Sequence, residues 1–314
     1  MNRRFALLQA AFSIVALAAV VWWASHQDAP HVPSSGSAIA WLVAGLAVYG
    51  LATLVRGERW HQILHLTGVE ARRSDCYALT TVGYMGNNVL PARAGEALRV
   101  VLLDARVDAG KRRLLGTIVA ERLLDVVVLA TLFVVLAFGA LQGIEVPEGG
   151  RVALGLALVG GVVAVAAAGW WTAQRSGRAE RLHTFMAPML AALTRLRGRH
   201  LTEVLTLSLV VWGIEVVGWW TVGIASGLDV NLLEAAFILA LSSMIVLIPS
   251  GPGYAGTLDV AIVLATQALG RSASAGLSYL LLLRFVIMVP ITAAGFLVLL
   301  VRYGGRRGLA EARS

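Results

Sequence analysis

Apolar residues occur in runs of about 20, the length that an α-helix needs to cross a bilayer, separated by short segments rich in arginine, glycine or proline. Runs of this length are typical of transmembrane helices rather than of strands or core helices. The pattern therefore predicts a polytopic all-α membrane protein with a single integral membrane domain over residues 1–314. Six runs predict full spans, at residues 5–24, 38–55, 114–141, 152–171, 201–225 and 276–301.

Two further apolar stretches are interrupted by polar and helix-breaking residues. Residues 74–103 contain GYMGNNVLPARAGEALRVVLL, with the bend expected at residues 87–95, and residues 231–269 are broken by IPSGPGYAG at 248–256. Irregular backbone at membrane depth is tolerated only where it is buried in protein or lines a wet cavity. Arginines flank the first stretch, which places its ends in the cytoplasm, whereas the second lies between sparsely charged loops. We expect two re-entrant helical hairpins.

The order of these segments indicates an inverted repeat with halves at about residues 38–141 and 201–302. The two breaks resemble each other, VLPARAGEAL beside LIPSGPGYAGTLD. Interrupted helices at matching positions of an inverted repeat point to a substrate site near the midplane of a secondary transporter. The halves are joined by a basic connector at about residues 174–200, whose helical apolar spacing fits an amphipathic helix on the cytoplasmic surface or a helix packed on the bundle.

Composition and charge narrow the class further. Charged residues make up 14% of the chain and hydrophobic residues 58%, far from the roughly one quarter charged of a soluble domain. The net charge of +8 comes from basic segments at helix ends, such as RGERW (56–60), so it fits a cytoplasmic excess of arginine and not nucleic-acid binding. Both termini are expected in the cytoplasm. The single cysteine and dispersed histidines predict no internal disulfide, metal or cofactor.

The first break carries the strongest candidate chemistry. Glu96 and Arg99 are three residues apart, so they share a helix face and could pair. A helix starting near Ala94 would direct its free N–H groups into the bend, where Arg93 lies, and this suits a phosphate. A structural ion pair that closes the turn is the alternative. The same wall includes Asn87, Asn88 and Pro91.

Charged residues also lie within two predicted spans. Glu121, Arg122 and Asp125 occupy the span at 114–141, and short acids at that depth need partners, which we expect from the first hairpin. Glu215 lies roughly 20 Å into the span at 201–225, at 1.5 Å per residue. Arg284 in the last span is the cation that we expect to pair with Glu215. For both groups, the alternative to a substrate site is a structural role in holding the bundle together.

The second break contains no charge, but its small residues have two interpretations. Glycine permits close backbone approach to a ligand, whereas small residues also allow tight helix packing. The candidates here are Pro249, Pro252, Gly253 and Gly256. The chain contains no phosphate-binding loop, nucleophile elbow or dinucleotide fingerprint, so we do not expect a nucleotide-driven pump or a hydrolase.

Four of these motifs together resemble the lysylphosphatidylglycerol synthase transmembrane-region family, also called flippase-like. They are NNVLPARAGEALR (87–99), ERLLD (121–125), IPSGPGYAG (248–256) and RGERW (56–60), and the resemblance covers about residues 5–302. In fused members of the family, this region moves an aminoacylated phospholipid between leaflets, and a soluble synthase domain makes that lipid. This chain stops at Ser314, so the resemblance implies a stand-alone lipid translocase of a bacterial or archaeal cytoplasmic membrane, without aminoacyl transfer.

The leading functional expectation is a flippase-like translocase for an anionic or modified phospholipid or an isoprenoid-linked lipid, and not an enzyme. Its expected partner is a membrane lipid with a phosphate-containing headgroup, and no nucleic acid. Two alternatives stay open: a membrane-embedded lipid-modifying transferase, and a non-catalytic lipid-binding accessory subunit. A homo-oligomer and a partner enzyme of lipid synthesis are both compatible with the sequence.

Overall fold

The computed structural model describes residues 33–90, 93–136, 187, 197–246 and 252–304, and all regular elements in these ranges are helical. Their order is α2 (Gly36–Leu66), α3 (Arg73–Val89), α4 (Ala94–Val107), α5 (Lys111–Val135), α8 (Arg199–Ser226), α9 (Leu232–Ile245), the 3₁₀ turn η3 (Pro252–Tyr254), α10 (Thr257–Ala268) and α11 (Ala273–Tyr303). The predicted all-α class is therefore confirmed for the described residues. The predicted spans at 5–24 and 152–171 and nearly all of the connector at 174–200 lie outside them.

Three of the described helices, α2, α8 and α11, are long and apolar enough to cross a membrane. They coincide with the spans predicted at 38–55, 201–225 and 276–301. The predicted span at 114–141 corresponds to α5, a helix of 25 residues whose Glu121 and Asp125 are buried. The chain thus has the helices expected of a polytopic protein, whereas their number across a membrane stays a prediction.

Helix α2 corrects one sequence expectation. It continues from the predicted end at Val55 to Leu66, so RGERW lies inside the helix. Arg56 and Arg59 are 6% and 0% exposed, because their guanidinium groups meet carboxylates of α5 and α8. These two arginines are therefore buried inside the helical bundle and are not part of the basic surface.

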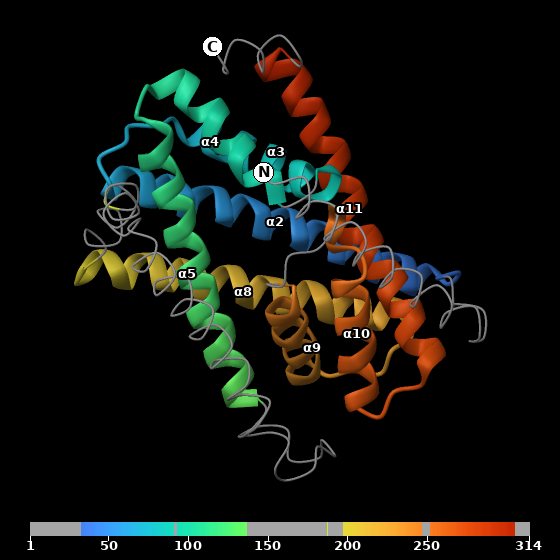
Figure 1. The fold of residues 1–314 in the computed structure, drawn as a ribbon. Coiled ribbons are helices and arrows are strands. Elements are labelled where there is room, and N and C mark those ends of the chain that lie inside the picture. The colour runs from blue at the N-terminus through green and yellow to red at the C-terminus, as the bar shows by residue number, and fades with distance from the viewer. Residues whose placement is uncertain (1–32, 91–92, 137–186, 188–196, 247–251, 305–314) are drawn as a thin grey trace, which may run out of the picture.

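Helices α2 and α8 pack side by side along the middle of the molecule (Figure 1). Small residues let them approach closely. A Cβ added to Gly45 of α2 would lie 3.0 Å from Val222, and one added to Gly218 of α8 would lie 3.3 Å from Val48. The other described helices are arranged around this central pair.

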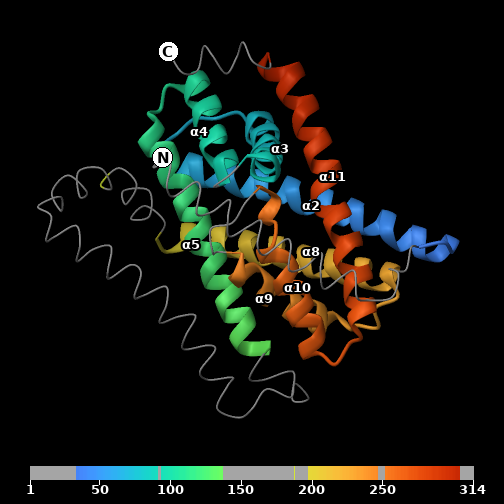
Figure 2. The ribbon, with the colours of Figure 1, turned by 45° about the vertical axis from the view of Figure 1, so that its right-hand side comes forward.

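Two interrupted helical pairs lie on opposite sides of α2 and α8. Helices α3 and α4 occupy one end and α9 and α10 the other, while α5 and α11 flank them in both views (Figures 1 and 2). The order long helix, broken pair, long helix thus occurs twice. The predicted pairing of segments into two hairpins is seen here, and their re-entrant path and inverted orientation stay predictions.

Candidate functional site

Both breaks in the helical pairs lie where the two pairs meet. Asn88, near the end of α3, donates a hydrogen bond of 2.9 Å to Thr292 of α11. Gly253 of η3 lies against the same region, since its Cβ would be 3.5 Å from the Asn88 carbonyl oxygen. Arg93, at the start of α4, donates a 2.9 Å hydrogen bond to the Val246 carbonyl at the end of α9. The structure therefore brings the two predicted breaks together.

Glycine determines how closely the first pair can approach. Gly95 of α4 sits against α3, and a Cβ there would overlap the carbonyl oxygen of Gly83. A Cβ on Gly86 would come within 2.6 Å of the Gly95 Cα atom. Any larger side chain would separate α3 from α4 and move the start of α4, which carries Arg93.

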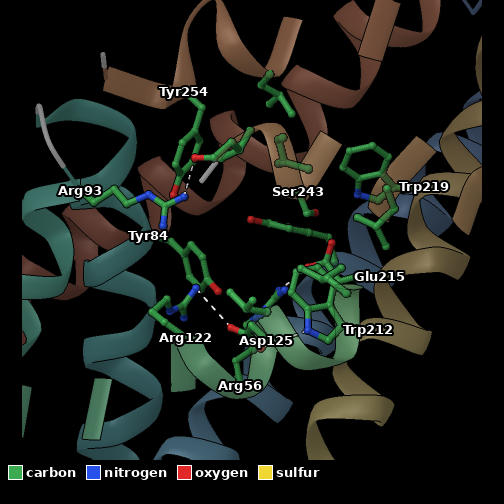
Figure 3. Close-up of a pocket in the computed structure, with 17 residues that line it drawn as sticks. Arg56, Tyr84, Arg93, Arg122, Asp125, Trp212, Glu215, Trp219, Ser243 and Tyr254 are labelled. Carbon is green, nitrogen blue, oxygen red and sulfur yellow. Dashed lines mark hydrogen bonds and ion pairs between the residues drawn. The ribbon is translucent and has the colours of Figure 1, made fainter. Parts of the chain in front are cut away.

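A cavity of about 160 Å³ lies beside the two breaks. Its wall is built from both halves of the chain, and the labelled side chains point toward a common centre (Figure 3). The wall combines charge with aromatic and aliphatic surface. Its polar and aromatic members are Tyr49, Arg56, Tyr84, Arg93, Arg122, Asp125, Trp212, Glu215, Trp219, Ser243 and Tyr254.

On one side of the cavity, Arg56 of α2 forms an ion pair with Glu215 of α8. The Arg56 guanidinium also lies 5.6 Å from the ring centre of Tyr84 and 5.2 Å from that of Trp212. The prediction that Arg284 pairs with Glu215 was wrong. Arg284 pairs with Asp259 of α10 and donates a 3.2 Å hydrogen bond to the Gly253 carbonyl. Arg284 therefore stabilises the second break.

Glu121 and Asp125 of α5, at and beside the cavity, form ion pairs with several arginines. Arg59 lies 2.6 Å from Asp125 and 3.4 Å from Glu121. Arg99 of α4 lies 3.0 Å from Glu121, with its guanidinium 4.0 Å from the ring centre of Trp60. The expectation that the first hairpin supplies a partner for Glu121 is thus confirmed, but α2 supplies the second arginine.

The predicted pair of Glu96 with Arg99 was wrong. Glu96 lies 3.6 Å from Arg122 instead, and Arg122 is also 3.3 Å from Asp125. Arg99 is buried and contacts Glu121, whereas Glu96 is half-buried. The two residues share one face of α4 only approximately, so each reaches a different residue of α5.

Arg93 differs from Arg56, Arg59, Arg99 and Arg122, the other arginines at and beside the cavity. Among the described residues it contacts no carboxylate. It donates to Val246 and lies 5.3 Å from the ring centre of Tyr254. Both Arg93 and Tyr254 have left-handed backbone, with φ of 54° and 57°, which is uncommon outside glycine. The two breaks are thus joined through their two most constrained residues.

The cluster carries one positive charge in excess within the described residues. Its cations are Arg56, Arg59, Arg93, Arg99 and Arg122, and its anions are Glu96, Glu121, Asp125 and Glu215. Each carboxylate has at least one arginine within ion-pair distance, so the excess falls on Arg93. Its guanidinium faces the cavity together with the Tyr254 ring (Figure 3). The arrangement suits an anion that enters beside Arg93.

The remaining predicted residues have different positions and roles in the structure. Asn87 is buried against Gly95, and Gly253 and Gly256 have positive φ of 62° and 84°. Gly256 donates its N–H to Asp259 at 2.9 Å, so both glycines supply backbone conformations that shape the second break. Pro252 is exposed. Pro91 and Pro249 lie outside the described residues.

The site also contains eight polar or aromatic residues that the sequence did not predict: Tyr49, Arg56, Arg59, Tyr84, Trp212, Trp219, Ser243 and Tyr254. A signal existed for the two arginines, since they are three residues apart and therefore share a helix face. Their position after an apolar run made a loop the simpler interpretation. The aromatic residues carried no signal, because aromatic residues are common in any membrane helix.

The fold and the site define a helical membrane protein with a charged cavity where two interrupted helical pairs meet. Residues 7–295 match the family described as lysylphosphatidylglycerol synthase TM region, and the chain belongs to this family. It is 23% identical over 265 residues to a UPF0104 membrane protein of Methanothermobacter thermautotrophicus, covering 76% of this chain and 78% of the relative. No solved structure matches the chain.

Proposed function

We propose that this protein is a lipid translocase, which binds the phosphate of an anionic or modified phospholipid or of an isoprenoid-linked lipid in the cavity and moves it between leaflets. The observation that carries this proposal is the excess positive charge at Arg93, between the two breaks. Guanidinium groups bind phosphate with two parallel hydrogen bonds. A charge that is removed from water is costly unless it is paired, so an anion that balances the half-buried guanidinium of Arg93 is favoured at this position.

The position of the cavity between two interrupted helical pairs supports movement of the ligand rather than a chemical reaction on it. Secondary transporters place their substrates between discontinuous helices of two repeats and alternate access around that site. Here the hydrogen bond from Arg93 to the Val246 carbonyl joins the two interrupted pairs, and the one from Asn88 to Thr292 ties the first pair to α11. A phosphate that takes the guanidinium of Arg93 would compete with the first contact and loosen one pair from the other.

The topology that we propose follows the same logic. The pair α3–α4 re-enters from the cytoplasmic side and the pair α9–α10 from the outer side of the cytoplasmic membrane, with both termini in the cytoplasm. The basic residues at the end of α4 and the start of α5 support this orientation, because arginine and lysine accumulate at the cytoplasmic ends of membrane helices. They are Arg106, Lys111, Arg112 and Arg113.

A translocation assay in proteoliposomes tests the proposal. Fluorescent phosphatidylglycerol, lysyl-phosphatidylglycerol and polyprenyl phosphate are compared with phosphatidylcholine, using quenching from outside with and without a proton gradient. At least one anionic or modified lipid should move, and Arg93→Gln should slow it by about tenfold or more, since one charge-assisted hydrogen bond contributes about 1.5–3 kcal/mol. Arg72→Gln is the matched control, because Arg72 is exposed before α3. Movement of none of the lipids by folded protein would refute the proposal.

A further inference from the structure

An apolar groove of about 440 Å³ lies between α5 and α8, next to the charged cavity. Aliphatic side chains such as Val128, Leu132, Leu209 and Val216 line it. Its one hydroxyl, on Thr131, donates 2.8 Å to the Val127 carbonyl of its own helix, so it offers a ligand no unsatisfied donor. The groove therefore suits hydrocarbon and not a polar group.

The cavity and the groove share a wall. Trp212 belongs to both linings. Its indole N–H donates 3.1 Å to Asp125, and the Arg56 guanidinium lies over its ring. On α5, Val126 and Leu129 line the cavity while Val127 and Val128 line the groove. The polar and apolar hollows are thus neighbours along the same turns of α5 and α8.

Gly213 leaves the groove open. A Cβ added there would meet no atom within 4 Å among the described residues. Gly218, on the other face of the same helix, behaves differently, because its Cβ would contact Val48 of α2. Small residues in membrane helices commonly serve helix packing, and Gly218 does so. Gly213 instead keeps space free beside Trp212.

We propose that the groove between α5 and α8 holds one hydrocarbon chain of the lipid whose headgroup occupies the cavity. This inference rests on the proposed function. A cavity of about 160 Å³ has room for a small headgroup and not for its chains, so a bound lipid must leave it through an apolar side. The α5–α8 groove lies on the other side of Trp212 and is the apolar hollow beside that residue. Since bilayer hydrocarbon is as apolar as the groove, the groove determines where the chain lies and contributes little to affinity.

Photo-crosslinking of the full chain in phosphatidylcholine nanodiscs tests this inference. The probe is phosphatidylglycerol with a diazirine in one acyl chain, and labelled peptides are identified by mass spectrometry. Labels should concentrate at residues 127–135 and 205–216 and fall at least fivefold with excess unlabelled phosphatidylglycerol. Labels at Leu297 and Leu300 of α11, which are 62% and 64% exposed, report bulk lipid and should not fall.

A pair of matched variants separates the groove from general lipid contact. Gly213→Leu should reduce groove labelling at least fivefold, because its side chain fills the open space. Gly50→Leu in α2 is the control, since Gly50 is also exposed inside a helix with no atom within 4 Å of its Cβ. Groove labelling that stays at the level of Leu297 and is not competed by unlabelled phosphatidylglycerol would overturn the inference.

Binding of glycerol 3-phosphate by calorimetry distinguishes this inference from the proposed function. If glycerol 3-phosphate binds and Arg93→Gln weakens it, while groove labelling is not competed, the headgroup site stands and the groove inference fails. If groove labelling is competed but glycerol 3-phosphate does not bind, the groove holds a chain and the headgroup site at Arg93 fails. Gly213→Leu should leave glycerol 3-phosphate binding unchanged.

Discussion

Removing Glu215 should destabilise the protein through the charge that it leaves behind. The Glu215→Gln variant keeps the size of the side chain but removes the carboxylate that pairs with Arg56. Arginine does not lose its proton in proteins, so Arg56 stays charged. Its side chain is buried, and among the described residues it also lies near the rings of Tyr84 and Trp212. These rings replace only part of the lost interaction.

The expected magnitude follows from the burial of both partners. Breaking a buried ion pair by removing one partner costs about 3–5 kcal/mol. At about 2 °C for each kcal/mol in a large domain, the apparent Tm of the purified protein in detergent should fall by about 6–10 °C. Thermal unfolding followed by tryptophan fluorescence, with size-exclusion chromatography to confirm a monodisperse starting state, measures this shift.

A double-mutant cycle tests the pairing itself. Glu215→Gln combined with Arg56→Met removes both charges, so the double variant should recover most of the lost stability, with a coupling energy of about 2 kcal/mol or more. Glu215→Gln combined with Arg284→Met is the control, since Arg284 pairs with Asp259 and the two effects should add. Recovery with Arg284→Met, or strict additivity with Arg56→Met, would refute the pairing.

Two further predictions concern the breaks. Arg284→Met leaves Asp259, which is 2% exposed, without its cation, so we expect a loss of about 3–5 kcal/mol that Asp259→Asn partly restores; chemical denaturation measures both variants. Gly95→Ala should lower the apparent Tm and the yield of folded protein, because its methyl group would overlap the Gly83 carbonyl and overpacking costs about 1–3 kcal/mol. Gly50→Ala, in open space, should be neutral or stabilising, and equal behaviour of the two alanine variants would contradict the close approach of α3 and α4.

The sequence alone determined the all-α membrane class and the approximate positions of the long helices and breaks among the described residues. Runs of apolar residues specify membrane helices because every backbone group in a bilayer must be satisfied within the protein. Proline and glycine at 248–256 disfavour a continuous helix for local reasons, since proline lacks the backbone N–H and clashes with the preceding turn. Charged residues such as Glu121 and Glu215, inside apolar runs, marked the interior of the bundle, since a lone charge in hydrocarbon is costly.

Only the tertiary structure decided which charges meet. Helical spacing shows that Glu96 and Arg99 lie near one face of α4. The packing of α4 against α5, however, places Glu96 beside Arg122 and Arg99 beside Glu121. Likewise, the close packing of α2 on α8 brings Glu215 and Arg56 together as an ion pair. The periodicity of one helix fixes the directions of its own side chains, whereas partners on other helices depend on crossing angle and register, which are set by the packing of many small and apolar residues at once.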